Sequence, residues 1–454
     1  MIDTRNLAHV LEVSVDKKTV VVEPNVPMDR LLDITLPYGL MPPVVMEFPG
    51  ITVGGGFSGT SGESSSFKYG LFESNVNSIE IIVPNGDVIT ASKSDHSDLF
   101  LGAASSFGTL GVTTLLELQL IEAKKYVELT YHPVVSMSEA IQRLEVATKD
   151  LSNDFVDAIL FSQHEGVVCI GRLTNVNQST IQQFGRPWDP WFYLHAQKLI
   201  KNRSTPITET IPLRDYLFRY DRGGFWVGSF AFKYFRCPFN RVTRWFLDDF
   251  LHVRVMYHAL HQSGLSSRYF VQDVGIPYEL ASDFAGFLDH TFGYYPVWLC
   301  PLSQRQQLGQ STFSDFEVNG QSTETRRLLN FGIWGRGPTN WEQFVEANRT
   351  LEHKVQELNG KKWLYAHTYY TEEEFWKIYD REKYDELREK YHATHLPTVY
   401  DKVRMRPALT RPRTFLARLY VWFWNIWPLK GLYGLFHAAA GREYLLNRSS
   451  LWKI

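Results

Sequence analysis

The chain has 454 residues, a formal net charge of −2 and an aromatic content of 15%. This length is enough for two domains with their own cores. The near-neutral charge and the lack of a basic groove interleaved with stacking aromatics exclude nucleic acid as a partner. Cys169, Cys237 and Cys300 are far apart, so they suggest neither a disulfide framework nor a metal site and indicate a reducing, cytosol-facing location.

The first residues predict a hairpin followed by a helix. Apolar residues alternate over 10–15 and 19–22, and the charged turn at 16–18 separates the two runs. A short amphipathic run over 28–35 then predicts a helix.

Residues 52–66 are the strongest candidate for a ligand-binding segment, because they contain five glycines and seven hydroxyl side chains. Such a segment can wrap a phosphate-bearing cofactor through main-chain N–H groups, since glycine adopts positive φ and has no Cβ to keep a ligand away. The alternative is a glycine-rich hairpin that binds nothing.

Gly54, Gly56 and Gly59 also satisfy the G-x-G-x-x-G spacing, and Glu80 follows at the distance of a ribose contact. A dinucleotide-binding fingerprint needs a buried strand before it and a helix opening within it. Here only residues 51–53 remain as a strand, and the residues that follow the glycines are poor helix formers. No G-K-[ST] ending is present, so a P-loop is excluded as well.

The next sixty residues add three further patterns. Two apolar runs flank Asn85-Gly86, which predicts a β-hairpin. Asp98-Leu99-Phe100 precedes a second glycine turn, Gly108-Thr109-Leu110-Gly111, and residues 112–121 then alternate as a strand does.

In this order, these patterns resemble the FAD-binding domain of the p-cresol methylhydroxylase (PCMH) and vanillyl-alcohol oxidase class. The chain is more similar still to the Δ24-sterol reductases of the Diminuto/seladin type, a resemblance that covers residues 6–402. The further segments that carry it are residues 68–72, 123–127, 211–214, 295–301 and 374–376.

The resemblance implies an α+β chain in three parts. A PCMH-type FAD-binding domain, with its second half largely present, takes residues 1–128; an α+β substrate or cap domain takes 129–400, and an aromatic, basic tail takes 401–454. The residues expected to bind FAD are Thr52, Val53, Gly54, Gly55, Gly56, Phe57, Ser58, Gly59, Thr60, Ser61, Gly62, Glu63 and Ser64, with Gly108, Thr109 and Gly111 of the second turn.

The middle part mixes strands and helices. Strands are expected over 155–161, 167–173 and 330–334, and helices over 242–262 and 341–358, the latter with Thr339 or Asn340 as its cap. Thr371 and Glu374 predict a capping box, and the charged run after it, to Tyr391, predicts a solvated helix face.

The tail differs in composition, with ten lysines and arginines against two acidic residues. Four of its ten aromatic residues cluster in residues 422–427, and Pro428 and Lys430 interrupt the apolar run that follows, which disfavours a straight membrane span. A helix in the lipid headgroup region or a re-entrant hairpin fits better. The alternative is a tail that packs its aromatics on the protein's own surface.

Two features depart from the family pattern. The resemblance implies a membrane anchor and a first pyrophosphate-binding half before the point where this sequence begins. We therefore expect either a fragment or truncated gene model, or a paralogue that has lost half of its cofactor cradle and binds FAD weakly. Phe67 stands where the family commonly has a histidine, which removes a titratable group close to the expected flavin.

The chemistry that the resemblance implies is addition of hydride from the flavin to C25 of a sterol side chain and of a proton to C24, with NADPH as the electron donor. Candidate proton donors are Asp273 and Tyr295, although a structural hydrogen bond is the better explanation for either residue taken alone. Trp298 and Cys300 alternate on one side of a strand and either line the substrate pocket or pack in the core.

The sequence therefore favours an FAD-linked, NADPH-dependent sterol side-chain reductase at a membrane surface, on the cytosolic face of the endoplasmic reticulum. Two alternatives are a non-catalytic, membrane-associated relative with impaired FAD binding, and an FAD-linked oxidase with another substrate.

Overall fold

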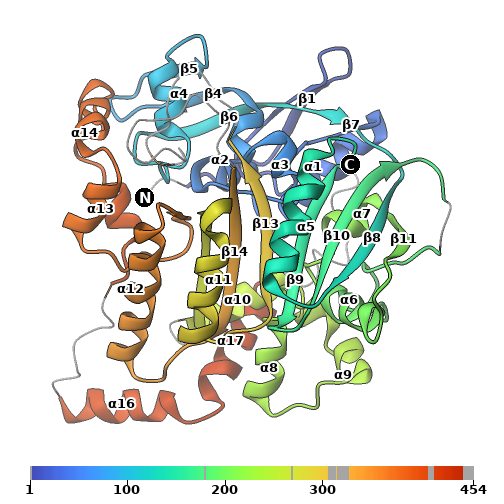
Figure 1. The fold of residues 1–454 in the computed structure, drawn as a ribbon. Coiled ribbons are helices and arrows are strands. Elements are labelled where there is room, and N and C mark those ends of the chain that lie inside the picture. Colours follow the sequence, from blue (N-terminus) through green and yellow to red (C-terminus); the bar gives the residue numbers. More distant parts are fainter. Residues whose placement is uncertain are drawn as a thin grey trace.

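The computed structural model describes residues 3–177, 180–266, 269–304, 313, 327–406 and 414–442. Two antiparallel sheets, with helices packed around them, make up most of these residues (Figure 1). Because helices and antiparallel strands occupy separate layers, the predicted α+β class is confirmed.

The first sheet has five strands in the order β1-β2-β6-β4-β5. Its strands are β1 (Val10–Ser14), β2 (Thr19–Val22), β4 (Val76–Ile82), β5 (Val88–Ser92) and β6 (Val112–Gln119). Both predicted hairpins are confirmed, since β1 pairs with β2 and β4 with β5, and Gly86 has the positive φ of 95° that its turn requires. Every pairing in this sheet is antiparallel, so a parallel dinucleotide-binding fold is excluded.

Short helices connect these strands. They are α1 (Met28–Thr35), α2 (Val53–Gly59), α3 (Ser66–Tyr69) and α4 (Ser97–Ala103), with the 3₁₀ turns η1 (Leu36–Tyr38) and η2 (Phe72–Asn75). The short strands β3 (Leu40–Met41) and β7 (Ile121–Glu122) pair with each other. The helix predicted over 28–35 is confirmed.

The expectation that residues 51–53 form a strand is wrong, because helix α2 begins at Val53. Thr52 caps it, and its side-chain Oγ1 accepts a hydrogen bond from the Gly55 N–H at 3.1 Å. Glycine is a poor helix former, but this helix lies closer to its neighbours than a side chain would allow. A Cβ on Gly54 would lie 2.6 Å from Pro24 Cβ, and one on Gly56 would lie 2.5 Å from Met46 Cε.

The second sheet has eight strands in the order β11-β8-β10-β9-β13-β14-β12-β15. Its strands are β8 (Tyr126–Val134), β9 (Phe155–Ser162), β10 (Glu165–Thr174), β11 (Ile207–Pro212), β12 (Tyr269–Pro277), β13 (Val297–Ser303), β14 (Arg327–Arg336) and β15 (Lys361–Lys362). The strands predicted over 155–161, 167–173 and 330–334 are confirmed in β9, β10 and β14.

Helices α5 (Met137–Lys149), α11 (Ala281–Thr291) and α12 (Trp341–Glu357) cover one face of this sheet (Figure 1). Asn340, one of the two predicted caps, caps α12 through a hydrogen bond from the Gln343 N–H at 3.1 Å. The other face lies against α6 (Phe192–Ile200), α7 (Leu213–Leu217) and the first sheet.

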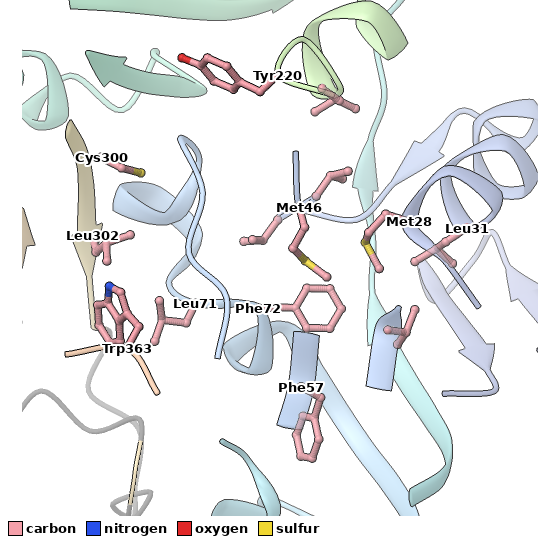
Figure 2. Packing of buried hydrophobic residues seen from close by; sticks show 14 of the residues in the cluster. Met28, Leu31, Met46, Phe57, Leu71, Phe72, Tyr220, Cys300, Leu302 and Trp363 are labelled. Carbon is pink, nitrogen blue, oxygen red and sulfur yellow. The ribbon is translucent and has the colours of Figure 1, made fainter. Parts of the chain in front are cut away.

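One apolar core joins the two sheets. Figure 2 shows Leu71 between Phe72 on one side and Leu302 and Trp363 on the other. The strand pairing changes from the first sheet to the second after β7, near the domain boundary expected at residue 128. The division into three parts remains a prediction.

The helix predicted over 242–262 is interrupted. The structure has α9 (Arg241–Phe246), the 3₁₀ turn η3 (Asp248–Phe250) and α10 (Val253–Ser263). A buried ionic network holds the break: Arg222 Nε donates to Asp248 Oδ1 at 2.8 Å, and His252 Nδ1 pairs with Asp221 Oδ2. Asp221 also accepts from the Val253 N–H at 3.1 Å and thereby caps α10.

The capping box of Thr371 and Glu374 is confirmed at α13 (Glu372–Ile378). The charged run that follows is not one solvated face, since a second helix, α14 (Arg381–Lys390), begins after its own cap, Asp380. Tyr384 and Leu387 of α14 are buried, and α14 packs against α4 of the first part.

Helices α15 (Val399–Val403), α16 (Phe415–Asn425) and α17 (Leu429–Ala440) are the last helices of the described chain. Helix α8 (Gly228–Phe235) precedes α9. Helix α17 packs closely on α10, since a Cβ on Gly434 would lie 2.3 Å from the Ala259 carbonyl oxygen. Across the described part of the chain, no helix is both long and apolar enough to span a bilayer.

We expect the stability of this fold to depend on His252. Burial lowers the pKa of His252, but Asp221 and Asp248 outweigh this effect and raise its pKa from 6.5 to about 9. The stabilisation is complete below about pH 6.5 and is lost as the pH rises through about 9. His252→Asn should lose about 3 kcal/mol of unfolding free energy at pH 6 and far less at pH 10, as measured by urea denaturation. The exposed His164→Asn serves as the control, and an equal loss at both pH values would contradict the prediction.

Candidate functional site

The two glycine turns, predicted separately, lie against each other. The Ser105 N–H donates to the Phe57 carbonyl at 3.0 Å, and the Phe107 N–H donates to the Ser58 carbonyl at 2.9 Å. The Thr60 hydroxyl donates to Ser105 Oγ. Thr60, Ser105 and Phe107 all have positive φ without being glycine, and such strain concentrates at ligand sites.

The glycines of the first turn divide into two kinds. Gly54, Gly56 and Gly62 have no room for a side chain, because protein atoms would lie within 2.8 Å of an added Cβ. Gly59 is open, since a Cβ there would meet nothing closer than Phe107 Cε1 at 4.0 Å. Gly55 is open except on the side of its cap, since a Cβ there would meet only Thr52 Oγ1, at 3.0 Å. Packing explains the first group, whereas the open pair leaves space for a ligand.

Several N–H groups expected to bind the cofactor are engaged within the protein. Gly54 donates to the Pro24 carbonyl at 2.8 Å, Gly55 to Thr52 Oγ1 and Gly56 to the Thr52 carbonyl. These three N–H groups are therefore not available to FAD, and backbone contact by the later positions of the segment remains a prediction. The segment still fits the cofactor, since its open glycines lie beside the strained turn.

Glu63 and Ser64, also predicted cofactor residues, are buried and hold the loop in place. Glu63 Oε1 accepts from the Glu47 N–H at 3.1 Å, and the Ser64 carbonyl accepts from the Val156 N–H of β9 at 2.8 Å. Contacts of Val53, Ser61 and the remaining members of the segment with the cofactor stay a prediction.

The second turn has packing roles of its own. The buried Thr109 hydroxyl donates to the Ser106 carbonyl at 2.8 Å and accepts from the Tyr384 hydroxyl at 2.8 Å. Gly111 has no space for a side chain, because a Cβ would lie 2.5 Å from the Ile82 carbonyl oxygen. Cofactor contacts by Gly108, Thr109 and Gly111 remain a prediction.

Phe67 lies in the apolar cluster on the helix-covered face of the second sheet. Its carbonyl accepts a hydrogen bond from Ser303 Oγ at 2.7 Å. A phenyl ring suits this environment, which explains how the chain accommodates the departure from histidine.

Asp273 of β12 lies on the opposite face of that sheet, and both of its oxygens are hydrogen-bonded. Trp334 Nε1 donates to Oδ2 at 3.0 Å, and Asn330 Nδ2 lies 3.4 Å from Oδ1. Burial raises the pKa of Asp273 to about 6, although these donors and the Lys362 ammonium act against the rise.

Tyr295 is not brought to the same place. Its hydroxyl donates to Asp289 of α11, and its ring packs on the helix-covered face. Trp298 and Cys300 do share one side of β13, as predicted, and both are buried. They belong to the core between the two sheets, and burial raises the pKa of the Cys300 thiol well above its usual range.

Glu47 is the acidic group that the sequence did not suggest. Glu47 lies in the segment between β3 and α2, and its backbone N–H donates a hydrogen bond to the Glu63 carboxylate. Burial raises the pKa of the Glu47 carboxyl to about 8, and the charges of Asp273 and Asp157 act in the same direction. The only available signal was one carboxylate within the apolar run of residues 40–49.

Two tyrosines lie near these acids. The side chains of Tyr257 on α10 and Tyr365 after β15 are 49% and 50% exposed. Burial raises the pKa of both hydroxyls, and the charges of Asp273 and Glu47 contribute to each rise. Glu47, Asp273, Tyr257 and Tyr365 are therefore close to one another, and we refer to them as the acid–tyrosine cluster.

The chain resembles known flavoproteins over most of its length. A family model described as an FAD binding domain matches residues 1–92. The Delta(24)-sterol reductases of Rattus norvegicus and Homo sapiens are each 31% identical over 402 residues, which cover 88% of this chain and 76% of theirs. The chain belongs to the Delta(24)-sterol reductase family. The Arabidopsis thaliana enzyme is 29% identical over 429 residues, which cover 86% of this chain and 74% of that one.

Family membership and the matched FAD binding domain make this chain an FAD-linked oxidoreductase. The FAD-binding match includes α2 and the loop after it, which contain the open glycines. Within the described residues, no group of three or more histidine, cysteine or acidic side chains is placed to hold a metal ion.

We expect the open glycines to control cofactor binding. In Gly55→Val and Gly59→Val, the added side chain meets little protein but fills the space left for the ligand. Both variants should fold and lose bound FAD, measured as flavin absorbance per mole of purified protein. Gly286→Val, at a glycine of α11 whose added Cβ would meet nothing within 4 Å, should keep its flavin. Full flavin content in both loop variants would contradict this role.

Proposed function

We propose that this protein reduces the C24=C25 double bond of a sterol side chain, with FAD as cofactor and NADPH as electron donor. The observation that carries the proposal is the 31% identity with Delta(24)-sterol reductases over 88% of the chain. The open glycines near the strained turn and the acid–tyrosine cluster support it.

An isolated alkene accepts hydride poorly, so the reduction needs an acid that delivers a proton as the hydride arrives. Bound FAD, once reduced by hydride from NADPH, would supply the hydride for C25. Residues 57–64 and the turn at 105–108 would hold it. The protein's own task is to hold the sterol side chain near the acid–tyrosine cluster and to place a protonated group beside C24.

Glu47 fits the role of that acid better than Asp273 does. With a pKa of about 8 it is mostly protonated at neutral pH. Asp273, with a pKa of about 6, is mostly ionised, and its charge favours protonation of Glu47. Two carboxyls whose environments separate their pKa values are a recurrent acid–base arrangement. Asp273 is the alternative donor.

We expect Glu47→Gln to lower kcat by about a hundredfold or more, the usual contribution of a positioned acid, while bound FAD stays unchanged. Wild-type kcat should fall as the pH rises through about 8, because Glu47 then loses its proton. Asp273→Asn removes a negative charge, so it should shift this fall to lower pH. If Asp273→Asn abolishes turnover and Glu47→Gln does not, Asp273 is the donor.

We also propose that the protein works on a membrane surface, the cytosolic face of the endoplasmic reticulum, and that the tail contributes to binding. Support comes from the excess of basic residues in 401–454 and from the exposed aromatic side chains of α16, among them Trp422 and Phe423.

Deleting the tail would uncover α10, so point substitutions test it better. Trp422→Ser with Phe423→Ser should weaken binding to vesicles that contain phosphatidylserine and leave FAD content unchanged, because both side chains are exposed. Co-sedimentation measures this. The control is Val88→Ser with Val146→Ser, two exposed apolar residues of other elements. Unchanged sedimentation of the tail variant would remove α16 from the membrane contact.

A further inference from the structure

Helix α9 displays apolar side chains to solvent on one face. Val242, Trp245 and Phe246, spaced three and four residues apart, are 69%, 52% and 78% exposed. Such spacing normally faces a protein core. A contiguous exposed apolar patch of this kind marks an interaction site.

The helix is fixed in this orientation. Asn240 and Thr243 form a capping box at its start, and Thr243 also bonds back to the Pro238 carbonyl at 2.5 Å. The network of Asp248 and His252 holds the residues just after it. The apolar face therefore points outward because both ends of the helix are anchored.

The surroundings of α9 are basic. Residues 228–247 include Lys233, Arg236, Arg241 and Arg244 and contain no aspartate or glutamate. The Arg244 guanidinium lies 4.9 Å from the centre of the Phe239 ring, so cationic and aromatic groups alternate here. This composition is typical of a surface that enters the headgroup region of an anionic bilayer.

The tail joins this surface from far along the chain. Trp427 Nε1 donates to the Tyr234 carbonyl at 2.6 Å, and the Arg236 guanidinium lies 4.5 Å from the centre of a Trp427 ring. The Gly431 N–H donates to the Tyr234 hydroxyl at 3.3 Å. Figure 1 shows α8, α9, α16 and α17 along the same lower edge of the molecule.

We propose that α9 is a second membrane-docking element, which places Trp245 and Phe246 in the headgroup region of an anionic lipid bilayer on the same edge of the molecule as α16 and α17. The inference rests on the proposed membrane location and extends it to a segment outside the tail. A second copy of this chain fits less well, because a two-fold contact would set the four cations of residues 228–247 against the same four.

Docking on this edge would bring the acid–tyrosine cluster close to the lipid. Tyr257 of that cluster is on α10, and α10 packs directly on α17. A sterol is an apolar molecule that dissolves in the bilayer, so a short path between the membrane and this helix keeps its side chain out of water.

The test uses the full chain with bound FAD and vesicles of phosphatidylcholine, with and without phosphatidylserine. Trp245→Ser with Phe246→Ser should weaken binding to the anionic vesicles at least tenfold and leave FAD content and reduction of detergent-dispersed sterol unchanged. Arg241→Gln with Arg244→Gln should weaken binding to anionic vesicles only. Val88→Ser with Val146→Ser should behave as the wild type does.

Wild-type affinity of the α9 variant for anionic vesicles would overturn the proposal. So would a loss of self-association in the same variant without a change in vesicle binding, since α9 would then be an interface between copies of the chain. Failure of the wild type to reduce sterols while α9-dependent binding persists would refute the proposed reaction and leave the docking surface intact.

Discussion

The carboxylate of Asp157, fully buried on β9, holds together the aromatic groups of the core between the two sheets. One of its oxygens, Oδ2, accepts from Arg219 at 2.8 Å, Tyr220 at 2.9 Å and Trp298 at 3.1 Å. Phe225 stacks on Tyr220 with ring centres 3.8 Å apart. Removal of one partner from such a buried pair costs about 3–5 kcal/mol, so this carboxylate fixes the aromatic side of the core that joins the two sheets.

Elements whose determinants are local could be predicted from the sequence. Two hairpins, helix α1 and the Asn340 cap need only residues close in the chain. Helix α2 could not be predicted from its own glycine-rich residues. Gly54 is needed there because Pro24 packs against it, and Pro24 is distant in the sequence. The break before α10 was missed for the same reason: the residues that impose it include Asp221, which precedes the helix by more than thirty residues.

The residues of the candidate site also divide into those that the sequence indicates and those whose role only the fold shows. Both glycine turns were recognised, because glycine density is visible in the sequence, but only the fold shows that Gly59 is open and Gly56 is packed. Asp273 was suggested together with Tyr295, and the sheet separates them onto opposite faces. Glu47 was missed because its chemistry arises from burial beside β12, a strand far along the chain.

The pKa values of Glu47 and His252 link the stability of the fold to the protonation of the proposed acid, Glu47. The raised pKa of Glu47 means that the folded chain holds this proton more tightly than the unfolded chain, so this group makes folding less favourable as the pH rises towards about 8. His252, whose charge anchors α10 beside the acid–tyrosine cluster, still stabilises the fold over most of that range, because its pKa is about 9. This helix is thus held most firmly under the conditions in which Glu47 remains protonated. Above about pH 9 the stabilisation by His252 is lost, and the ionised Glu47 carboxylate makes the folded state less favourable.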